Sequence, residues 1–115
     1  MVPVALKAAE QLEQQGVSCE VIDPRTIRPL DIDTIVESVK KTNRVVLAEE
    51  SHPICGVNAE ISTQIMERAF DYLDAPIKRV SGADVPMPYA KNLENLAIPD
   101  VARIVAAVRE VAYLD

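Results

Sequence analysis

Length, composition and charge restrict the class of protein to which this chain can belong. Its 115 residues, 49% of them hydrophobic, are enough for one domain with one core. Eighteen acidic residues against twelve basic ones give a formal net charge of −6, and no apolar run approaches the roughly 20 residues of a membrane span. We therefore expect neither a nucleic-acid partner nor a membrane partner.

The cysteine and histidine content argues against a metal site. Two cysteines, Cys19 and Cys55, and one histidine, His52, supply too few ligands for zinc, and the cysteines lack CxxC spacing. We expect buried, reduced thiols inside a cell, with a disulfide as the less favoured alternative.

The first half of the chain predicts two helices and a strand. Apolar residues at helical spacing predict a helix over residues 3–15 that stops at Gly16. Alternating polarity over residues 17–21 predicts a strand that is exposed on one side. Asp31 can cap a second helix that closes near Thr42, with an apolar stripe along one face.

The second half predicts two strands and two more helices. Residues 45–48 are continuously apolar, which is typical of a buried parallel strand. A helix from Gly56, ended by Pro76, precedes a short strand over residues 77–80. The last helix is predicted to start at Pro99.

The stretch from residue 80 to residue 94 is predicted to be an ordered loop with a restricted backbone, neither helix nor strand. Gly82 permits positive φ, and Pro86 and Pro88 each fix φ and lack a backbone donor. Ordered loops of this kind often form an interface or a binding site, so this loop is a candidate functional segment.

Strands that alternate with helices predict an α/β fold. Right-handed crossovers between parallel strands place helices on both faces of the sheet. We therefore expect a single domain over residues 1–115, a three-layer α/β/α sandwich with a mostly parallel sheet.

Chemistry-bearing side chains follow the predicted central strand. Glu49 and His52 lie just past its carboxyl end, where open parallel sheets collect ligands, and a Glu/His pair could perform acid–base work or bind a metal. No third partner or nucleophile accompanies them, so we assign no catalytic, cofactor-binding or metal residue. The alternative is an autonomous small-ligand or redox domain that uses Glu49, His52 and Cys55 on one loop.

Two further features have competing explanations. Gly56 at a helix start could accept an anion through free amides, but close packing against a strand is favoured. Asp23, Arg25 and Arg28 lie in one turn, where a structural ion pair is favoured over a substrate clamp.

Long ordered motifs extend over nearly the whole chain. They are VID-RTIRPLD from Val21, SVKKTNRVV from Ser38, YLDAP from Tyr72 and GADVPMPYAKNLE from Gly82. With these motifs the chain resembles the C-terminal domain, of the transketolase C-terminal type, of pyruvate dehydrogenase decarboxylase beta subunits. The resemblance implies a transketolase C-terminal-like fold.

The resemblance also implies a function in assembly and docking. Such a domain helps to assemble an α2β2 heterotetramer with the alpha subunit and a second beta subunit. It also docks the enzyme on the peripheral subunit-binding domain of dihydrolipoyl acetyltransferase. By resemblance, Asp74 and the C-terminal carboxylate of Asp115 are the partner-docking residues. From the residues alone, Asp74 could equally well only end the third helix.

Cofactors belong, by the same resemblance, to other parts of the enzyme. Thiamine diphosphate and Mg would be bound by a preceding domain and by the alpha subunit, so these 115 residues alone are expected to be inactive. They would support the thiamine-dependent oxidative decarboxylation of pyruvate, whose acetyl groups pass to lipoamide. The expected location is the cytoplasm of a bacterium or the mitochondrial matrix of a eukaryote.

The chain departs from the family pattern in two places that bear on the fold. Asn58 stands where the family commonly has glycine. Met1 falls where the family's first strand has just ended, so that strand and the preceding thiamine-binding domain are expected to be missing from residues 1–115. A missing strand would leave a sheet edge unpaired.

Overall fold

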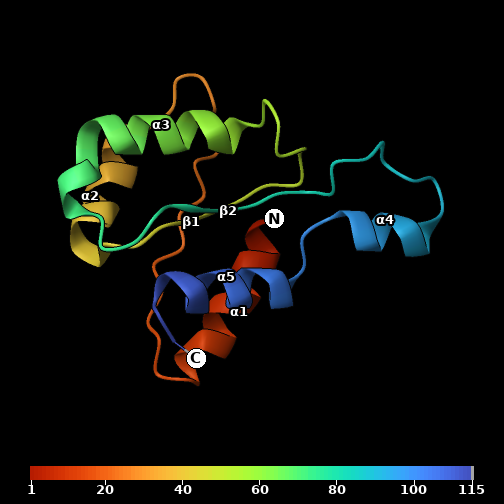
Figure 1. The fold of residues 1–115 in the computed structure, drawn as a ribbon, viewed down its shortest axis with the longest axis horizontal. Helices are drawn as coiled ribbons and strands as arrows, with labels where there is room; N and C mark the ends of the chain where they lie inside the picture. The colour runs from red at the N-terminus through yellow and green to blue at the C-terminus, as the bar shows by residue number, and fades with distance from the viewer. Residues whose placement is uncertain (115) are drawn as a thin grey trace.

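The computed structural model describes residues 1–114. Figure 1 shows a short sheet in the middle of the molecule, with helices on both sides of it and another helix held away at one end. No helix described within residues 1–114 is long and apolar enough to cross a membrane. The elements, in chain order, are α1 (Val2–Glu13), α2 (Ile32–Thr42), β1 (Val46–Ala48), α3 (Val57–Ala69), the 3₁₀ helix η1 (Phe70–Tyr72), β2 (Lys78–Val80), α4 (Lys91–Ala97) and α5 (Val101–Val111).

The sheet separates two apolar cores. Strands β1 and β2 pair in parallel, with Val46 opposite Lys78. Val45 and Leu47 pack against the core formed by α2 and α3. Val46 and Ala48 pack against the core that contains residues of α1 and α5. Because successive side chains of a strand point to opposite faces, β1 contributes to both cores, and the predicted three-layer α/β/α sandwich is confirmed.

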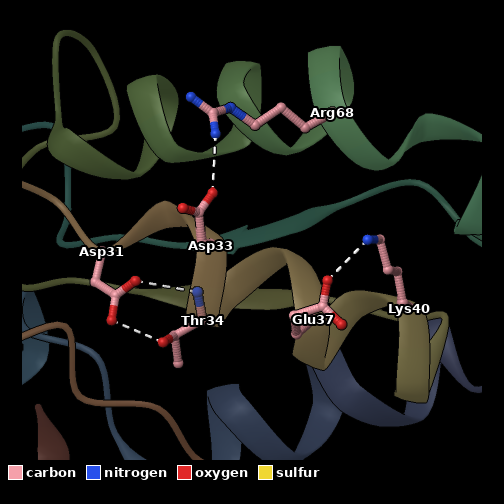
Figure 2. A network of polar contacts seen from close by, with 6 residues as sticks. All are labelled: Asp31, Asp33, Thr34, Glu37, Lys40 and Arg68. Carbon is pink, nitrogen blue, oxygen red and sulfur yellow. Dashed lines mark hydrogen bonds and ion pairs between the residues drawn. The ribbon is translucent and has the colours of Figure 1, made fainter.

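Polar side chains fix the start of α2 and its position against α3. Asp31 caps the helix: its carboxylate accepts hydrogen bonds from the Thr34 backbone N (3.1 Å) and the Thr34 hydroxyl (2.7 Å), as Figure 2 shows. The hydroxyl bond, followed by the backbone bond, lowers the pKa of Asp31. Arg68 of α3 reaches Asp33 of α2 at 3.1 Å, which ties the two helices together.

The predicted strand over residues 17–21 is wrong. The side chains alternate as the pattern indicates, with Val17, Cys19 and Val21 half-buried and Ser18 and Glu20 exposed. The segment nevertheless has no strand geometry, and within the described chain no backbone hydrogen bond joins residues 18–23 to β1. An alternating pattern predicts which side chains are buried, but a strand also requires a neighbouring backbone.

The prediction of a loop over residues 80–94 holds for residues 81–90, because Val80 ends β2 and α4 follows residue 90. Helix α4 begins at Lys91, where a Lys91–Glu94 ion pair of 2.9 Å joins residues one turn apart. Gly82 is not needed for positive φ, since the glycine with positive φ is Gly16 (φ 81°), which follows α1. A Cβ on Gly82 would lie 2.6 Å from the Glu50 carbonyl oxygen, so close backbone approach is what requires glycine there.

The start of the last helix also differs by two residues from the prediction. Asp100 is the N-cap of α5 and accepts a 2.8 Å hydrogen bond from the Arg103 backbone N. Pro99 therefore precedes the cap and is not the first helical residue. A capping carboxylate defines a helix start more sharply than a proline that is merely tolerated in the first turn.

Candidate functional site

At the carboxyl end of the sheet, the Glu49 carboxylate serves the fold. It follows β1 and accepts hydrogen bonds from the Ser81 hydroxyl (3.1 Å) and the Asn58 backbone N (3.2 Å). Asn58 lies in the first turn of α3, so the carboxylate occupies the place where an external anion would bind. A Cβ on Gly56 would lie 2.5 Å from Glu49 Oε1, and close packing, the favoured explanation of Gly56, is confirmed.

His52 and Cys55 take separate positions in the same loop. The Nε2 atom of His52 lies 2.8 Å from the Val85 carbonyl oxygen, and it can donate a hydrogen bond to that oxygen. Cys55 is a free, exposed thiol with a left-handed backbone (φ 58°), so the expectation of a buried thiol is wrong at this position. Residues 1–114 contain no group of three or more His, Cys, Asp or Glu side chains that could hold a metal ion. Glu49 and His52 thus connect parts of the fold, and among the described residues they form no metal-ligating group with Cys55.

Residues 83–97, here called the arm, extend from the carboxyl end of the sheet to α4 (Figure 1). The base of the arm is closed by hydrogen bonds from Ala83 N to the Ala97 carbonyl (2.7 Å) and from Gly82 N to the Ser51 carbonyl (2.9 Å). The arm is therefore anchored at both ends although it stands away from the cores. Its exposed large apolar side chains are Val85, Met87, Tyr89, Leu93 and Leu96.

A group of exposed apolar side chains on one segment is typical of an interaction surface. The sequence indicated a functional loop here, but the apolar side chains of α4 were missed. Leu93 and Leu96 are three residues apart, which is a helical spacing and a signal that could have predicted α4.

Asp74 lies at the opposite, amino end of the sheet. Its backbone is held by hydrogen bonds from Asp74 N to the Asn43 carbonyl (2.8 Å) and from the Tyr113 hydroxyl to the Asp74 carbonyl (3.4 Å). Its side chain is exposed, and within residues 1–114 its carboxylate forms no ion pair. Asp115, the other predicted docking residue, lies outside the described residues.

The turn after residue 22 contains the structural ion pair that was favoured there. Arg25 Nε lies 3.2 Å from Asp23 Oδ2, and the Arg25 backbone N donates to Asp23 Oδ1 at 3.1 Å. Both contacts are local to the turn and exposed, so they fix the turn and contribute little to stability. Arg28 does not take part in this pair.

Comparison with known proteins identifies close relatives. The model of the family "Transketolase, C-terminal domain" matches residues 1–104. A pyruvate dehydrogenase E1 component subunit beta of Rhizobium meliloti is 59% identical over 95% of this chain and 24% of the relative. Its counterpart in Rickettsia felis is 56% identical over 97% of this chain and 34% of the relative. A mitochondrial beta-1 subunit of Arabidopsis thaliana is 56% identical over 98% of this chain and 31% of the relative.

A solved structure shares the fold. It is described as "Split gene transketolase, inactive beta4 tetramer", and it superposes with a TM-score of 0.81 at 29% identity, over 98% of this chain and 35% of that chain. This chain thus spans between 24% and 35% of the length of these relatives. The chain belongs to the transketolase C-terminal domain family, and it matches the version of that domain found in pyruvate dehydrogenase E1 beta subunits.

Proposed function

We propose that this domain serves assembly and docking in a pyruvate dehydrogenase E1 enzyme and has no catalytic activity alone. The observation that carries the proposal is the arm, which is anchored at its base and exposes five large apolar side chains. Such side chains are costly to leave in water, and a partner that covers them gains apolar burial.

The proposed partners of the arm are the alpha subunit and a second beta subunit. Obligate subunit interfaces are large and apolar, and aromatic residues and Met are enriched in interfaces. The arm exposes Met87 and Tyr89, which are two residues apart, in the segment that leads into α4. A homologous domain in a chain described as a tetramer is consistent with this assignment.

The proposed function of the amino end is docking on the peripheral subunit-binding domain of dihydrolipoyl acetyltransferase. Asp74 presents an exposed carboxylate on a well-anchored backbone, and the whole chain carries a net charge of −6. A basic partner would be steered toward such a surface, and a charge pair would fix its orientation. Asp115 is proposed to contribute its carboxylate to the same surface.

Thiamine diphosphate and Mg are proposed to bind elsewhere in the complete enzyme. Residues 1–114 contain no group of three or more His, Cys, Asp or Glu side chains that could hold a metal ion, and this supports the proposal. The domain would support oxidative decarboxylation of pyruvate by holding the subunits in place. Since relatives occur in bacteria and in plant mitochondria, we propose the bacterial cytoplasm or the mitochondrial matrix as the location.

The arm can be tested by mixing the chain with a pyruvate dehydrogenase E1 alpha subunit and measuring complex mass by size-exclusion chromatography with light scattering. We expect a complex with the unmodified chain and at least a roughly tenfold weaker one with Met87→Asp, because a carboxylate placed in an apolar contact must be desolvated. Met66→Asp, an exposed methionine of α3, is the matched control. Equal binding by Met87→Asp and the unmodified chain would refute the assignment of the arm.

A further inference from the structure

The first half of the arm contains a segment whose backbone is restricted by proline. Residues 86–88 lie outside every helix and strand, and Met87 stands between Pro86 and Pro88. A proline ring fixes φ at about −65°, and it also pushes the residue before it toward β or polyproline II angles. Each residue from 85 to 88 is therefore restricted, by its own ring or by the ring that follows it, in a way that is compatible with a polyproline II helix.

The backbone of this segment has few partners within the chain. Among the described residues, no backbone–backbone hydrogen bond involves residues 84–89. The contact between the Val85 carbonyl and His52 Nε2 (2.8 Å) anchors the start of the segment. A polyproline II helix likewise forms no internal hydrogen bonds, so its remaining carbonyls can accept hydrogen bonds from another molecule.

The side chains of the segment divide into a sheltered edge and an exposed one. A polyproline II helix has three residues per turn, so Pro86 and Tyr89 share one edge, and Val85 and Pro88 share another. Pro88 is half-buried, whereas Pro86 is exposed and Tyr89 is fully exposed. Met87, on the third edge, is also exposed. The edge of Pro86 and Tyr89 is therefore the one that a partner can cover most fully.

A polyproline II segment is recognised by grooves lined with aromatic side chains, because its preformed backbone loses little entropy on binding. The 115 residues contain one Phe, three Tyr and no Trp, and Tyr89 lies on the segment itself. In the described chain, the cavities of about 460 Å³ and about 180 Å³ beside β1 have no aromatic lining. Of the two partners proposed for the arm, a second copy of this domain thus offers no such groove there, which favours the alpha subunit.

We propose that residues 85–89 form a polyproline II ligand that docks in an aromatic-lined groove of the alpha subunit. The proposal rests on the proposed function of the arm and specifies how the arm binds. Pro86 and Tyr89 would enter the groove, and the unpaired carbonyls of the segment would accept hydrogen bonds from donors along its rim.

The first test measures how backbone restriction affects affinity for a pyruvate dehydrogenase E1 alpha subunit, by calorimetric titration. Pro86→Ala and Pro86→Gly leave Met87 and Tyr89 in place but free the backbone by increasing amounts. We expect affinity to fall roughly two- to fivefold for Pro86→Ala and further for Pro86→Gly, because the freed backbone must be ordered on binding. Pro76→Ala, an exposed proline at the other end of the sheet, is the matched control and should bind normally.

The outcomes separate this proposal from the assignment of the arm itself. Equal affinities of the unmodified chain, Pro86→Ala and Pro86→Gly, together with weak binding by Met87→Asp, would overturn the polyproline II ligand and keep the arm as an interface. Normal binding by Met87→Asp as well, or no binding by the unmodified chain, would overturn both. Melting temperatures of all variants establish that each is folded.

The second test identifies the chemistry of the groove. Tyr89 is replaced by the photoreactive residue benzoylphenylalanine, the complex with the alpha subunit is irradiated, and the cross-linked peptide is identified by mass spectrometry. We expect cross-links to a segment that contains aromatic side chains, and none when Tyr72, at the amino end of the sheet, is replaced instead. Cross-links from position 89 to a charged surface without aromatic residues would overturn the proposal.

Discussion

The two ends of the sheet are built in different ways. At the carboxyl end, the Glu49 carboxylate joins Ser81 to the start of α3, and glycines at 56 and 82 let backbones approach closely. At the amino end, Asp74 is held only through its backbone and leaves its carboxylate in water. The difference teaches that the arm depends on close packing at its base, whereas the docking surface proposed at the amino end would depend on charge. Substitutions at the carboxyl end should therefore lower the stability of the fold, whereas substitution of Asp74 at the amino end should leave stability almost unchanged.

The largest effect on stability is expected for Gly82→Ala. The added Cβ would lie 2.6 Å from the Glu50 carbonyl oxygen and 3.2 Å from that of Ser51, and both atoms are backbone atoms that cannot rotate away. We expect a loss of roughly 1–3 kcal/mol in the free energy of unfolding, measured by urea denaturation.

Gly16→Asn is the control for Gly82→Ala. Nothing lies within 4 Å of a Cβ at Gly16, and asparagine tolerates its positive φ of 81° better than most residues. A larger loss of stability at position 16 than at position 82 would show that backbone conformation, and not close approach, limits this fold.

A smaller effect is expected for Glu49→Gln. Glutamine removes the negative charge that strengthens both hydrogen bonds, and its NH₂ group must face the Ser81 hydroxyl, which then has to turn from donor to acceptor. We expect destabilisation of about 1–2 kcal/mol by thermal or urea unfolding. Glu67→Gln, an exposed position on α3, should leave stability unchanged. Equal free energies of unfolding for the two variants would contradict the structural role of the Glu49 carboxylate.

A pH dependence of stability should arise at the cap of α2. Hydrogen bonds from Thr34 lower the pKa of Asp31 in the folded chain. A carboxyl with a depressed folded pKa contributes stability above its unfolded pKa, and the contribution is lost as pH falls through the folded pKa. Melting temperatures of the unmodified chain and of Asp31→Asn should therefore differ at pH 7 and converge as the pH falls below the depressed pKa of Asp31. A constant difference across this range would contradict the capping role of the ionised form.

The smallest effect on stability is expected for Asp74→Asn. Its carboxylate makes no ion pair in the described chain, so the free energy of unfolding should change by less than about 0.5 kcal/mol. A loss well above that value, measured by urea denaturation, would support the other explanation, that Asp74 mainly ends the helix before it.

The sequence predicted elements that local patterns define and missed those that depend on neighbours. Asp31 starts α2 as expected because a cap is a local interaction. The expected alternation in burial is present at Val17, Cys19 and Val21. A strand also needs a neighbouring backbone to pair with, and a local sequence pattern does not reveal that neighbour. Helix α4 was missed because the prolines before it suggested a loop throughout.

The candidate site was predictable in its residues but not in their partners. Glu49 and His52 were expected just past β1, and they lie there. That Glu49 caps α3 and His52 contacts Val85 depends on distances between segments that are far apart in sequence. Among the described residues, Asn58 Nδ2 is a buried side-chain donor without a hydrogen-bond partner, and the residue type alone does not reveal that burial.

The most direct test of two functionally separate ends is calorimetric titration of the chain with the peripheral subunit-binding domain of a dihydrolipoyl acetyltransferase. The unmodified chain, Asp74→Asn and Met87→Asp would be compared at low and high salt. We predict that Asp74→Asn weakens binding roughly three- to tenfold and reduces its salt dependence, since one charge pair is lost, whereas Met87→Asp binds as the unmodified chain does. Weaker binding by Met87→Asp with normal binding by Asp74→Asn would contradict the account.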